Sequence, residues 1–107
     1  MVDNRLKNLE VDAKANVYFD GKVTSRSCYR EDGTRFTLGI ITAGTYTFGT
    51  GDKEIIQMIA GEVEVLRPGD TDWVKFGVGD TYEVVGNCEF QIRTEGVAEY
   101  LCDYVKE

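Results

Sequence analysis

Histidine is absent from the 107-residue sequence. Because histidine is the commonest general base and a preferred metal ligand, its absence excludes the usual catalytic triad and any histidine-based metal centre. Catalysis by this chain must therefore depend on carboxylates, arginine, lysine, tyrosine, hydroxyl groups and backbone amides.

Cysteine and proline are scarce. The three cysteines, Cys28, Cys88 and Cys102, lie far apart and form no Cys-x-x-Cys pair, which argues against a zinc knuckle or a redox pair. We expect reduced, mostly buried thiols and a cytoplasmic location, because free thiols persist in reducing compartments. A single proline beside twelve glycines indicates many tight turns.

Positive charge and long apolar runs are also in short supply. The formal net charge is -7, and a surface this acidic repels phosphate backbones, so we expect no nucleic-acid partner. One small anion in a local basic pocket is compatible with that charge. No apolar run approaches the length of a transmembrane helix, and the N-terminal segment lacks the apolar stretch of a secretory signal, so we expect no membrane association.

Short strand-like segments, separated by turn signals, follow one another from residue 17 onward. About nine or ten strands at a spacing of roughly 8–12 residues, with no convincing long helix, predict an all-β sandwich or barrel. The expected strands are residues 22–30, 34–41, 44–49, 55–60, 62–65, 73–76, 81–85, 88–94 and 98–105.

The chain shows no internal repeat, low-complexity tract or linker, so we predict one domain over residues 16–107. Residues 1–15 are polar and charged, and we predict that they form a flexible or docked N-terminal arm. Gly61 and Glu62 are expected to form a hairpin between a buried strand and a half-exposed one.

Glu54 stands at the head of the apolar run 55–60. A carboxylate placed in a core without a partner is costly. Glu54 is therefore expected either at a solvated rim or in a polar pocket that uses its charge.

Two stretches resemble the signature motifs of cupins: Glu54 followed by Gly61, and the run Gly77-Val78-Gly79-Asp80-Thr81-Tyr82. Typical cupins place three histidines and a glutamate in these motifs as metal ligands. Here Phe48, Thr50 or their neighbours, and Tyr82, occupy the matching histidine places. The resemblance implies a single-domain jelly-roll β-barrel in which only the glutamate of the ligand set is kept.

A closer resemblance covers residues 16–104, through the segments NVYFDGKV, GTYTFGTGDKE, IAGEVEV, DTDWV, VVGNCEFQI and EYLCDY. In their order and spacing these segments are similar to the small cupin-fold pyrimidine/purine nucleoside phosphorylases. The resemblance implies a homodimeric jelly roll of broad specificity. It would cleave purine and pyrimidine nucleosides with inorganic phosphate to free base and α-D-ribose 1-phosphate, with no metal or other cofactor. The alternatives are a non-catalytic cupin that binds a small molecule and a metal-dependent cupin enzyme.

Phosphorolysis needs a held phosphate and stabilisation of positive charge on the ribose, but no strong base. Arg35 and Thr37 share one face of a predicted strand with Gly39 and are candidates for the phosphate, to which Thr50 could add donors. The alternative for Arg35 is an exposed strand residue paired with an acidic neighbour. Glu54 suits the ribose hydroxyls and an oxocarbenium-like transition state.

The nucleobase requires a flat apolar slot and a partner for its polar edge. Stacking tolerates different bases, whereas ordinary core packing is the alternative for every aromatic candidate. The candidates are Tyr46, Phe48, Tyr82 and Phe90 for stacking, and Gln57 or Gln91 for the base edge. The face formed by Tyr100, Cys102 and Tyr104 is expected to be apolar surface that a second copy of the chain covers.

Overall fold

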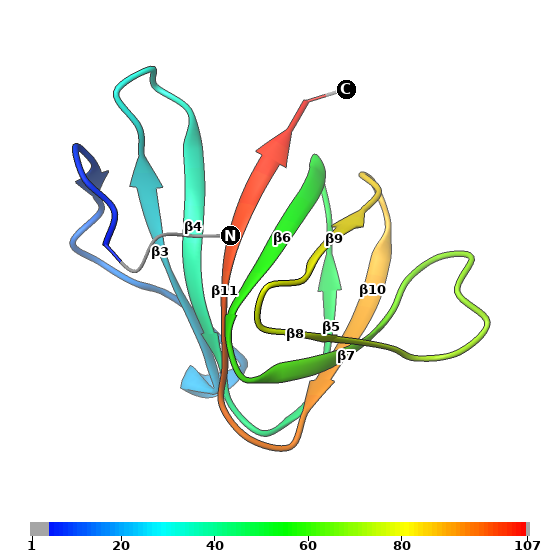
Figure 1. Ribbon diagram of the computed structural model, residues 1–107. Coiled ribbons are helices and arrows are strands. Elements are labelled where there is room, and N and C mark those ends of the chain that lie inside the picture. The colour runs from blue at the N-terminus through cyan, green and yellow to red at the C-terminus, as the bar shows by residue number, and fades with distance from the viewer. Residues whose placement is uncertain (1–4, 107) are drawn as a thin grey trace.

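The computed structural model describes residues 5–106, and these residues form strands joined by turns (Figure 1). The all-β prediction is confirmed, and the nine strands β3 to β11 fall where the sequence predicts them. The elements are β1 (Glu10–Val11), β2 (Asn16–Tyr18), the 3₁₀ turn η1 (Phe19–Gly21), β3 (Val23–Tyr29), β4 (Arg35–Ile41), β5 (Gly44–Gly49), β6 (Lys53–Ala60), β7 (Glu62–Leu66), β8 (Val74–Gly77), β9 (Thr81–Val84), β10 (Glu89–Thr94) and β11 (Ala98–Val105). Within residues 5–106, no helix is long and apolar enough to cross a membrane.

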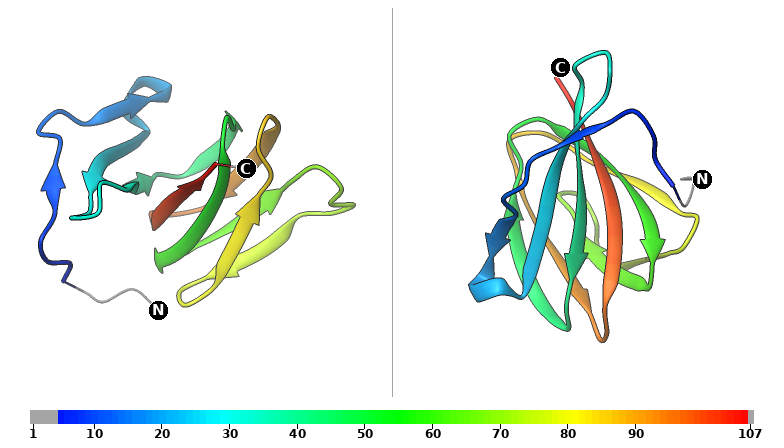
Figure 2. Two further views of the ribbon diagram at one scale, coloured as in Figure 1. Left: turned by 90° about the horizontal axis from the view of Figure 1, so that it is seen from above. Right: turned by 90° about the vertical axis from the view of Figure 1, so that its left-hand side faces the viewer.

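Two antiparallel sheets pack face to face (Figure 2). The large sheet has the order β1-β3-β4-β11-β6-β9, with β2 also paired to β3, and the small sheet has the order β5-β10-β7-β8. The chain passes repeatedly from one sheet to the other, as it does from β4 to β5 and from β5 to β6. This two-sheet arrangement is the sandwich that the spacing of turns and strands predicts.

The core lies between the two sheets, because alternate residues of each strand face the opposite sheet. Val23, Ile41 and Ala98 form an apolar row on the large sheet, and Val63 and Val65 face them from the small sheet. Each of these five side chains is at most 2% exposed. This part of the interior is therefore closed and dry.

The outer face of the large sheet carries a second, smaller cluster. Cys28, Phe36 and Leu101 are buried there, with Leu9 and Leu38 packed against them. Because β1 pairs with β3 in the large sheet, the segment before β2 runs along this face and supplies Leu9. The face that holds Tyr100, Cys102 and Tyr104 is the inner one, so the expectation that these three residues form an uncovered surface is wrong.

The hairpin expected at Gly61 and Glu62 is also wrong. Strand β6 pairs with β11 and β9 in the large sheet, whereas β7 pairs with β10 and β8 in the small sheet. Gly61 therefore turns the chain from one sheet to the other, with φ of 70°. A Cβ at this position would lie 3.0 Å from the Cα of Ala98 and would collide with the carbonyl oxygen of Val97.

Gly61→Ala should destabilise the fold more than Gly33→Ala. Both glycines have positive φ, but a Cβ at Gly33 would meet no atom within 4 Å. We expect a loss of about 1–2 kcal/mol for Gly33→Ala, from the backbone conformation alone. Gly61→Ala should lose roughly 1–3 kcal/mol more, from the collision. Urea unfolding of the two variants measures the difference, and equal losses would contradict the corner geometry.

Candidate functional site

The inner face of the large sheet changes from apolar to polar along its strands. Beyond the apolar row, the register brings Ser27, Thr37 and Cys102 into one cross-strand row. In the next row Tyr104 pairs with Glu54 of β6. Arg35 of β4 lies on the other side of Tyr104, because the pair one step before it is Phe36 with Asp103. Chemically active side chains are thus collected on the part of the inner face that lies beyond the apolar row.

Glu54 is the first inward-facing residue of β6, and its side chain is partly buried. Burial raises the pKa of its carboxyl group, and a hydrogen bond from the Cys102 thiol, with Sγ 3.6 Å from Oε1, opposes that rise. Five ion pairs form among residues 5–106, and none includes Glu54. This carboxylate is held by a thiol instead of a cation, which is a costly arrangement typical of functional sites.

The donor set around Glu54 does not fit the metal centre of typical cupins. In the part of the chain that the structure describes, no three His, Cys, Asp or Glu side chains are placed to hold one metal ion. Burial and the nearby Glu54 charge raise the pKa of Cys102, so its thiol stays protonated and acts as a donor.

Arg35 begins β4 with its guanidinium on the inner face. Its Cζ lies 4.8 Å from the centre of the Tyr104 ring, and Nη2 donates to the hydroxyl of Ser27 at 3.2 Å. No carboxylate of residues 5–106 forms an ion pair with it. Arg35 is exposed, as the alternative expected, but the pairing with an acidic neighbour is not observed among residues 5–106. Besides Ser27, the Tyr29 hydroxyl interacts with this guanidinium, which has further N–H donors.

Tyr104 separates Arg35 from Glu54 and contacts both sides of the row. Its hydroxyl shares a hydrogen bond of 3.0 Å with the hydroxyl of Thr37, and burial raises its pKa. The backbones of Arg35 and Glu54 are two strand spacings apart, roughly 9.5 Å. Two side chains of opposite charge can thus reach into one space from either side of a neutral tyrosine.

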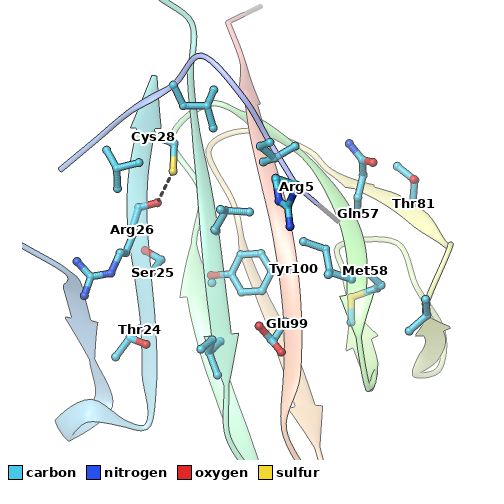
Figure 3. A pocket seen from close by; sticks show the side chains of 18 of the residues that line it. Arg5, Thr24, Ser25, Arg26, Cys28, Gln57, Met58, Thr81, Glu99 and Tyr100 are labelled. Atoms are coloured by element: carbon cyan, nitrogen blue, oxygen red, sulfur yellow. Dashed lines mark hydrogen bonds between the residues drawn. The ribbon is translucent and has the colours of Figure 1, made fainter. Parts of the chain in front are cut away.

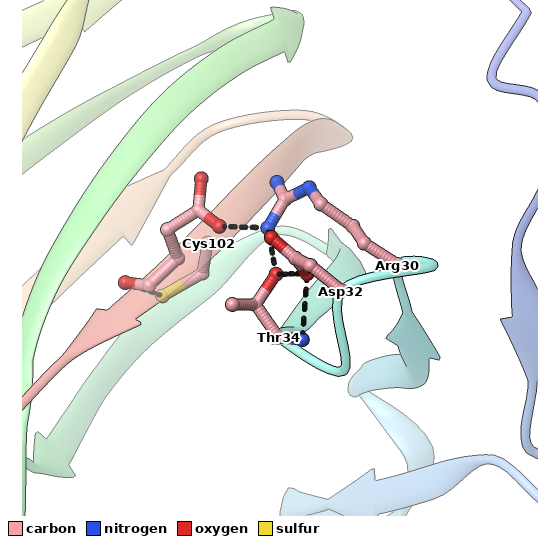
Figure 4. A network of polar contacts seen from close by, with 5 residues as sticks. Arg30, Asp32, Thr34 and Cys102 are labelled. Carbon is pink, nitrogen blue, oxygen red and sulfur yellow. Dashed lines mark hydrogen bonds and ion pairs between the residues drawn. The ribbon is translucent and has the colours of Figure 1, made fainter.

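The turn between β3 and β4 is fixed by its own polar network (Figure 4). Arg30 pairs with Asp103 of β11 at 2.8 Å and donates to the Thr34 hydroxyl at 3.3 Å. Asp32 accepts from the backbone N–H of Thr34 at 2.9 Å. Because Arg35 follows this turn directly, the network holds the start of β4 against β11.

Tyr100 lies at the centre of the inner face, with its ring across Gly39. A Cβ at Gly39 would collide with that ring, so glycine leaves the space that the tyrosine fills. Its hydroxyl end points toward the side of β3 that carries Ser25 (Figure 3). Burial raises the pKa of Tyr100, and its hydroxyl therefore stays protonated.

Aromatic rings from β2, η1 and the small sheet pack together in a cluster that we call the aromatic wall. Phe48 stacks on Phe90, with ring centres 6.0 Å apart, and the edges of Tyr18 and Phe19 meet Phe48 at 6.3 and 5.3 Å. Tyr18 is 44% exposed and Phe19 is 42% exposed, so this wall reaches solvent. Neither residue was selected as a site candidate in the sequence analysis. Two adjacent aromatic residues directly before an Asp-Gly turn are the feature of the sequence that could have indicated them.

Two of the aromatic candidates are engaged in the core. The hydroxyl of Tyr46 donates to the carbonyls of Thr42 and Ala43 at 2.9 and 3.1 Å. Tyr82 stacks on Phe76 with ring centres 4.3 Å apart and is 3% exposed. Phe48 is therefore the one of these four candidates that is partly exposed in the aromatic wall, whereas Tyr46, Tyr82 and Phe90 are buried in the core.

The remaining polar candidates do not reach the polar end of the inner face. The Thr50 hydroxyl donates to the carbonyl of Val85 at 2.7 Å and accepts from the backbone N–H of Cys88 at 3.1 Å, which ties two turns together. Gln57 lies between the inward-facing positions of β6 and so faces outward, and Gln91 is exposed on the outer face of β10. Strand alternation separates both glutamines from Glu54.

A cavity of about 980 Å³ lies on the outer face of the large sheet, on the other side of the sheet from Glu54 and Arg35 (Figure 3). Leu9, Val11, Leu38, Ile40 and Ile59 are among its lining residues. We call this cavity the outer groove. The lining also includes the charged side chains of Arg5, Arg26 and Glu99. The inner face is the better candidate for chemistry because it holds Glu54, a partly buried carboxylate whose pKa is raised by burial.

The fold is shared with solved structures of distant sequence. The EutQ protein of Clostridium difficile has a TM-score of 0.66 and 14% sequence identity, over 77% of this chain and 67% of that protein. This likeness defines the class of the fold, a cupin-like two-sheet sandwich.

The sequence comparisons identify the family. Residues 13–104 match the family described as pyrimidine/purine nucleoside phosphorylase. A protein of Syntrophotalea carbinolica with that name is 46% identical over 103 residues, which cover 96% of this chain and 99% of the relative. A crystal structure from Acinetobacter sp. ADP1, described as a protein of unknown function, has a TM-score of 0.91 and 35% identity over 94% of this chain and 98% of that one. The chain belongs to the pyrimidine/purine nucleoside phosphorylase family.

Glu54→Gln should stabilise the fold near neutral pH. Since the folded pKa of Glu54 lies above its ordinary value of 4.5, the folded state binds more protons than the unfolded state between these two pKa values. Stability contributed by this residue therefore falls as pH rises through that window, and glutamine removes the loss. Urea unfolding should show a gain near neutral pH that disappears below 4.5.

Glu89→Gln is the matched control, because Glu89 is exposed on the small sheet. Its substitution should leave the pH profile of stability unchanged. A less stable Glu54→Gln variant at neutral pH would mean that the carboxylate is well compensated in the folded state.

Proposed function

We propose that this chain is a nucleoside phosphorylase of broad specificity. It cleaves purine and pyrimidine nucleosides with inorganic phosphate: a phosphate oxygen forms a bond to C1′ of the ribose as the bond from C1′ to the base nitrogen breaks. The products are free base and α-D-ribose 1-phosphate. Membership of the pyrimidine/purine nucleoside phosphorylase family supports this activity.

One observation carries the assignment of the site. Among residues 5–106, an arginine without a carboxylate partner and a partly buried glutamate without a cation partner lie in one row, on either side of Tyr104. These two opposite charges suit the two substrates, because one substrate needs a positive partner and the other needs a negative one. Phosphate is an anion, and the ribose becomes positive as the glycosidic bond breaks.

Arg35 binds the phosphate in this proposal, and Thr37 assists. A guanidinium presents a planar set of donors that matches an oxyanion. The hydroxyls of Thr37 and Tyr104 share one hydrogen bond, in which one of them donates to the other. The second hydroxyl hydrogen can then be donated to the phosphate.

Glu54 binds the ribose hydroxyls and stabilises positive charge on the sugar. Its carboxylate accepts from two adjacent hydroxyl groups, and its charge interacts more strongly with the transition state than with the neutral nucleoside. The partly buried position increases that interaction, because solvent screens it less.

The nucleobase stacks against Phe48 and Tyr18 in this proposal. Both rings are part of the aromatic wall, and a ring face attracts purines and pyrimidines alike, which accounts for broad specificity. Gln57 and Gln91 have no role in this arrangement. The three free cysteines are consistent with action in the cytoplasm.

We further propose that the protein is a homodimer, joined through the outer groove. Ile40 is 42% exposed and Ile59 is 37% exposed there, on the same sheet face as the small cluster around Phe36. A second copy would cover this apolar surface by an exchange of equivalent contacts.

Ile40→Asp should shift the dimer to monomer, because the charge would be buried at the interface. Sedimentation at micromolar concentration measures the change. Val85→Asp is the control, since Val85 is 56% exposed and lies outside the lining of the groove. A monomeric wild type, or an unaffected Ile40→Asp dimer, would contradict this interface.

Release of uracil from uridine, measured with and without inorganic phosphate, tests the activity. Strict dependence on phosphate is expected. Arg35→Ala should lower kcat/KM by about 10- to 100-fold, because a charged hydrogen bond is lost. Arg35→Lys should recover only part of the loss, since it keeps the charge without the planar donors.

Arg93→Ala is the matched control, because Arg93 pairs with Glu64 on the outer face of the small sheet. It should retain wild-type activity. Uracil release that ignores phosphate would indicate a hydrolase, and no release from any nucleoside would favour a non-catalytic binding protein.

A further inference from the structure

A chain of polar side chains connects β2, β3 and β4 beside Arg35. Asn16 donates through Nδ2 to the hydroxyls of Ser25 and Ser27, at 3.2 and 3.1 Å, and Arg35 donates to the same Ser27 hydroxyl at 3.2 Å. We call Asn16, Ser25, Ser27 and Arg35 the polar ladder. Its two serines are each 5% exposed and face the interior.

The hydrogen-bond inventory of Ser27 is unbalanced. A hydroxyl oxygen has two lone pairs and one hydrogen. Both lone pairs of Ser27 are used, by Asn16 and by Arg35. Among the hydrogen bonds of residues 5–106, none is donated by this hydroxyl. A buried O–H with nothing to donate to is costly, and this position therefore suits a visiting acceptor.

Ser25 repeats the same pattern one step further along β3. Its oxygen accepts from Asn16, and no side chain or carbonyl of the described residues accepts its hydrogen. The remaining N–H groups of Arg35 add further donors. The Asp12 carboxylate, which follows β1, is engaged by the hydroxyl of Tyr29 at 3.0 Å. The ladder thus presents donors to the interior.

We propose that the polar ladder is the phosphate subsite, in which Ser25 and Ser27 donate directly to the phosphate and Asn16 positions both serines. This inference rests on the proposed phosphorylase activity and extends it to three residues outside the set that sequence reasoning selected. Donors without acceptors favour an oxyanion over a sugar, because each ribose hydroxyl also needs an acceptor for its own hydrogen.

The position of the ladder agrees with the chemistry at Glu54. The serines lie in the rows of Gly39 and Thr37, and Arg35 lies in the row of Tyr104. A phosphate bound there approaches the interior from the β3 side, while Glu54 holds the ribose from the β6 side. The two substrates then meet over β11, where the hydroxyls of Tyr100 and Tyr104 are protonated donors.

Ser27→Ala should raise the KM for phosphate about tenfold and leave the KM for uridine unchanged. Asn16→Asp should raise the phosphate KM further, because its carboxylate would accept from both serines and repel the anion. Thr24→Ala is the control, since Thr24 lies on the same strand but lines the outer groove.

A second measurement does not depend on turnover. Inorganic phosphate should raise the Tm of the wild type and of Thr24→Ala, whereas Ser27→Ala and Asn16→Asp should respond weakly or not at all, with sodium chloride of equal ionic strength as reference. The same scans report whether each variant is folded.

The two experiments separate the two claims. If wild type releases no base but phosphate still protects it through the ladder, the proposed activity fails and the anion site stands. If phosphate-dependent release is intact and Ser27→Ala changes neither the phosphate KM nor the protection by phosphate, the ladder is overturned. A change in the uridine KM alone would overturn it as well, because the serines would then hold the nucleoside.

Discussion

Strand β11 is hydrogen-bonded to β4 on one side and to β6 on the other, and its register decides which side chains meet inside the protein. Cys102 reaches Glu54 from this strand, and Tyr104 reaches Thr37 and Arg35. The site is therefore assembled around one central strand that connects two charges otherwise too far apart to cooperate. Packing of the small sheet against this strand supplies the apolar surroundings in which Glu54 is partly buried, whereas Arg35 stays exposed at the start of β4.

Tyr104 explains why Arg35 and Glu54 do not form an ion pair with each other. A direct ion pair between Arg35 and Glu54 would satisfy both groups and leave nothing for a substrate. Tyr104 prevents that contact, since its ring lies against the guanidinium and its backbone is opposite Glu54. Some stability is given up for reactivity, as is common where a protein holds polar groups ready for a ligand.

Much of the fold was visible in the sequence because strand alternation is a local property. Residues 34–41 alternate so clearly that Arg35 and Thr37 could be assigned to one face, and Glu54 could be recognised as a carboxylate at the edge of a buried strand. The sequence did not reveal which of the two sheets each strand joins. Nothing local to Gly61 distinguishes a hairpin from a corner between sheets, because the difference depends on partners in β11 and β10 that are distant along the chain.

The same limit applies to the site. Gln57 and Gln91 have suitable chemistry, but the parity of their positions turns them to the outer faces. Asn16, Ser25 and Ser27 carry no motif, and their meaning appears only when β2, β3 and β4 are placed side by side. A hydrogen-bond inventory needs coordinates, since it counts partners that the sequence does not name.

Strand β4 has two working surfaces, since Thr37 and Gly39 face the interior while Leu38 and Ile40 face the outer groove. Inserting or deleting one residue in this strand would exchange the two sets, placing leucine beside Tyr104 and threonine on the apolar exterior. The same holds for β6 and β11. An insertion or deletion is therefore expected to be tolerated in the turns, such as residues 31–34 and 67–73, and to disrupt the site when it falls in these three strands.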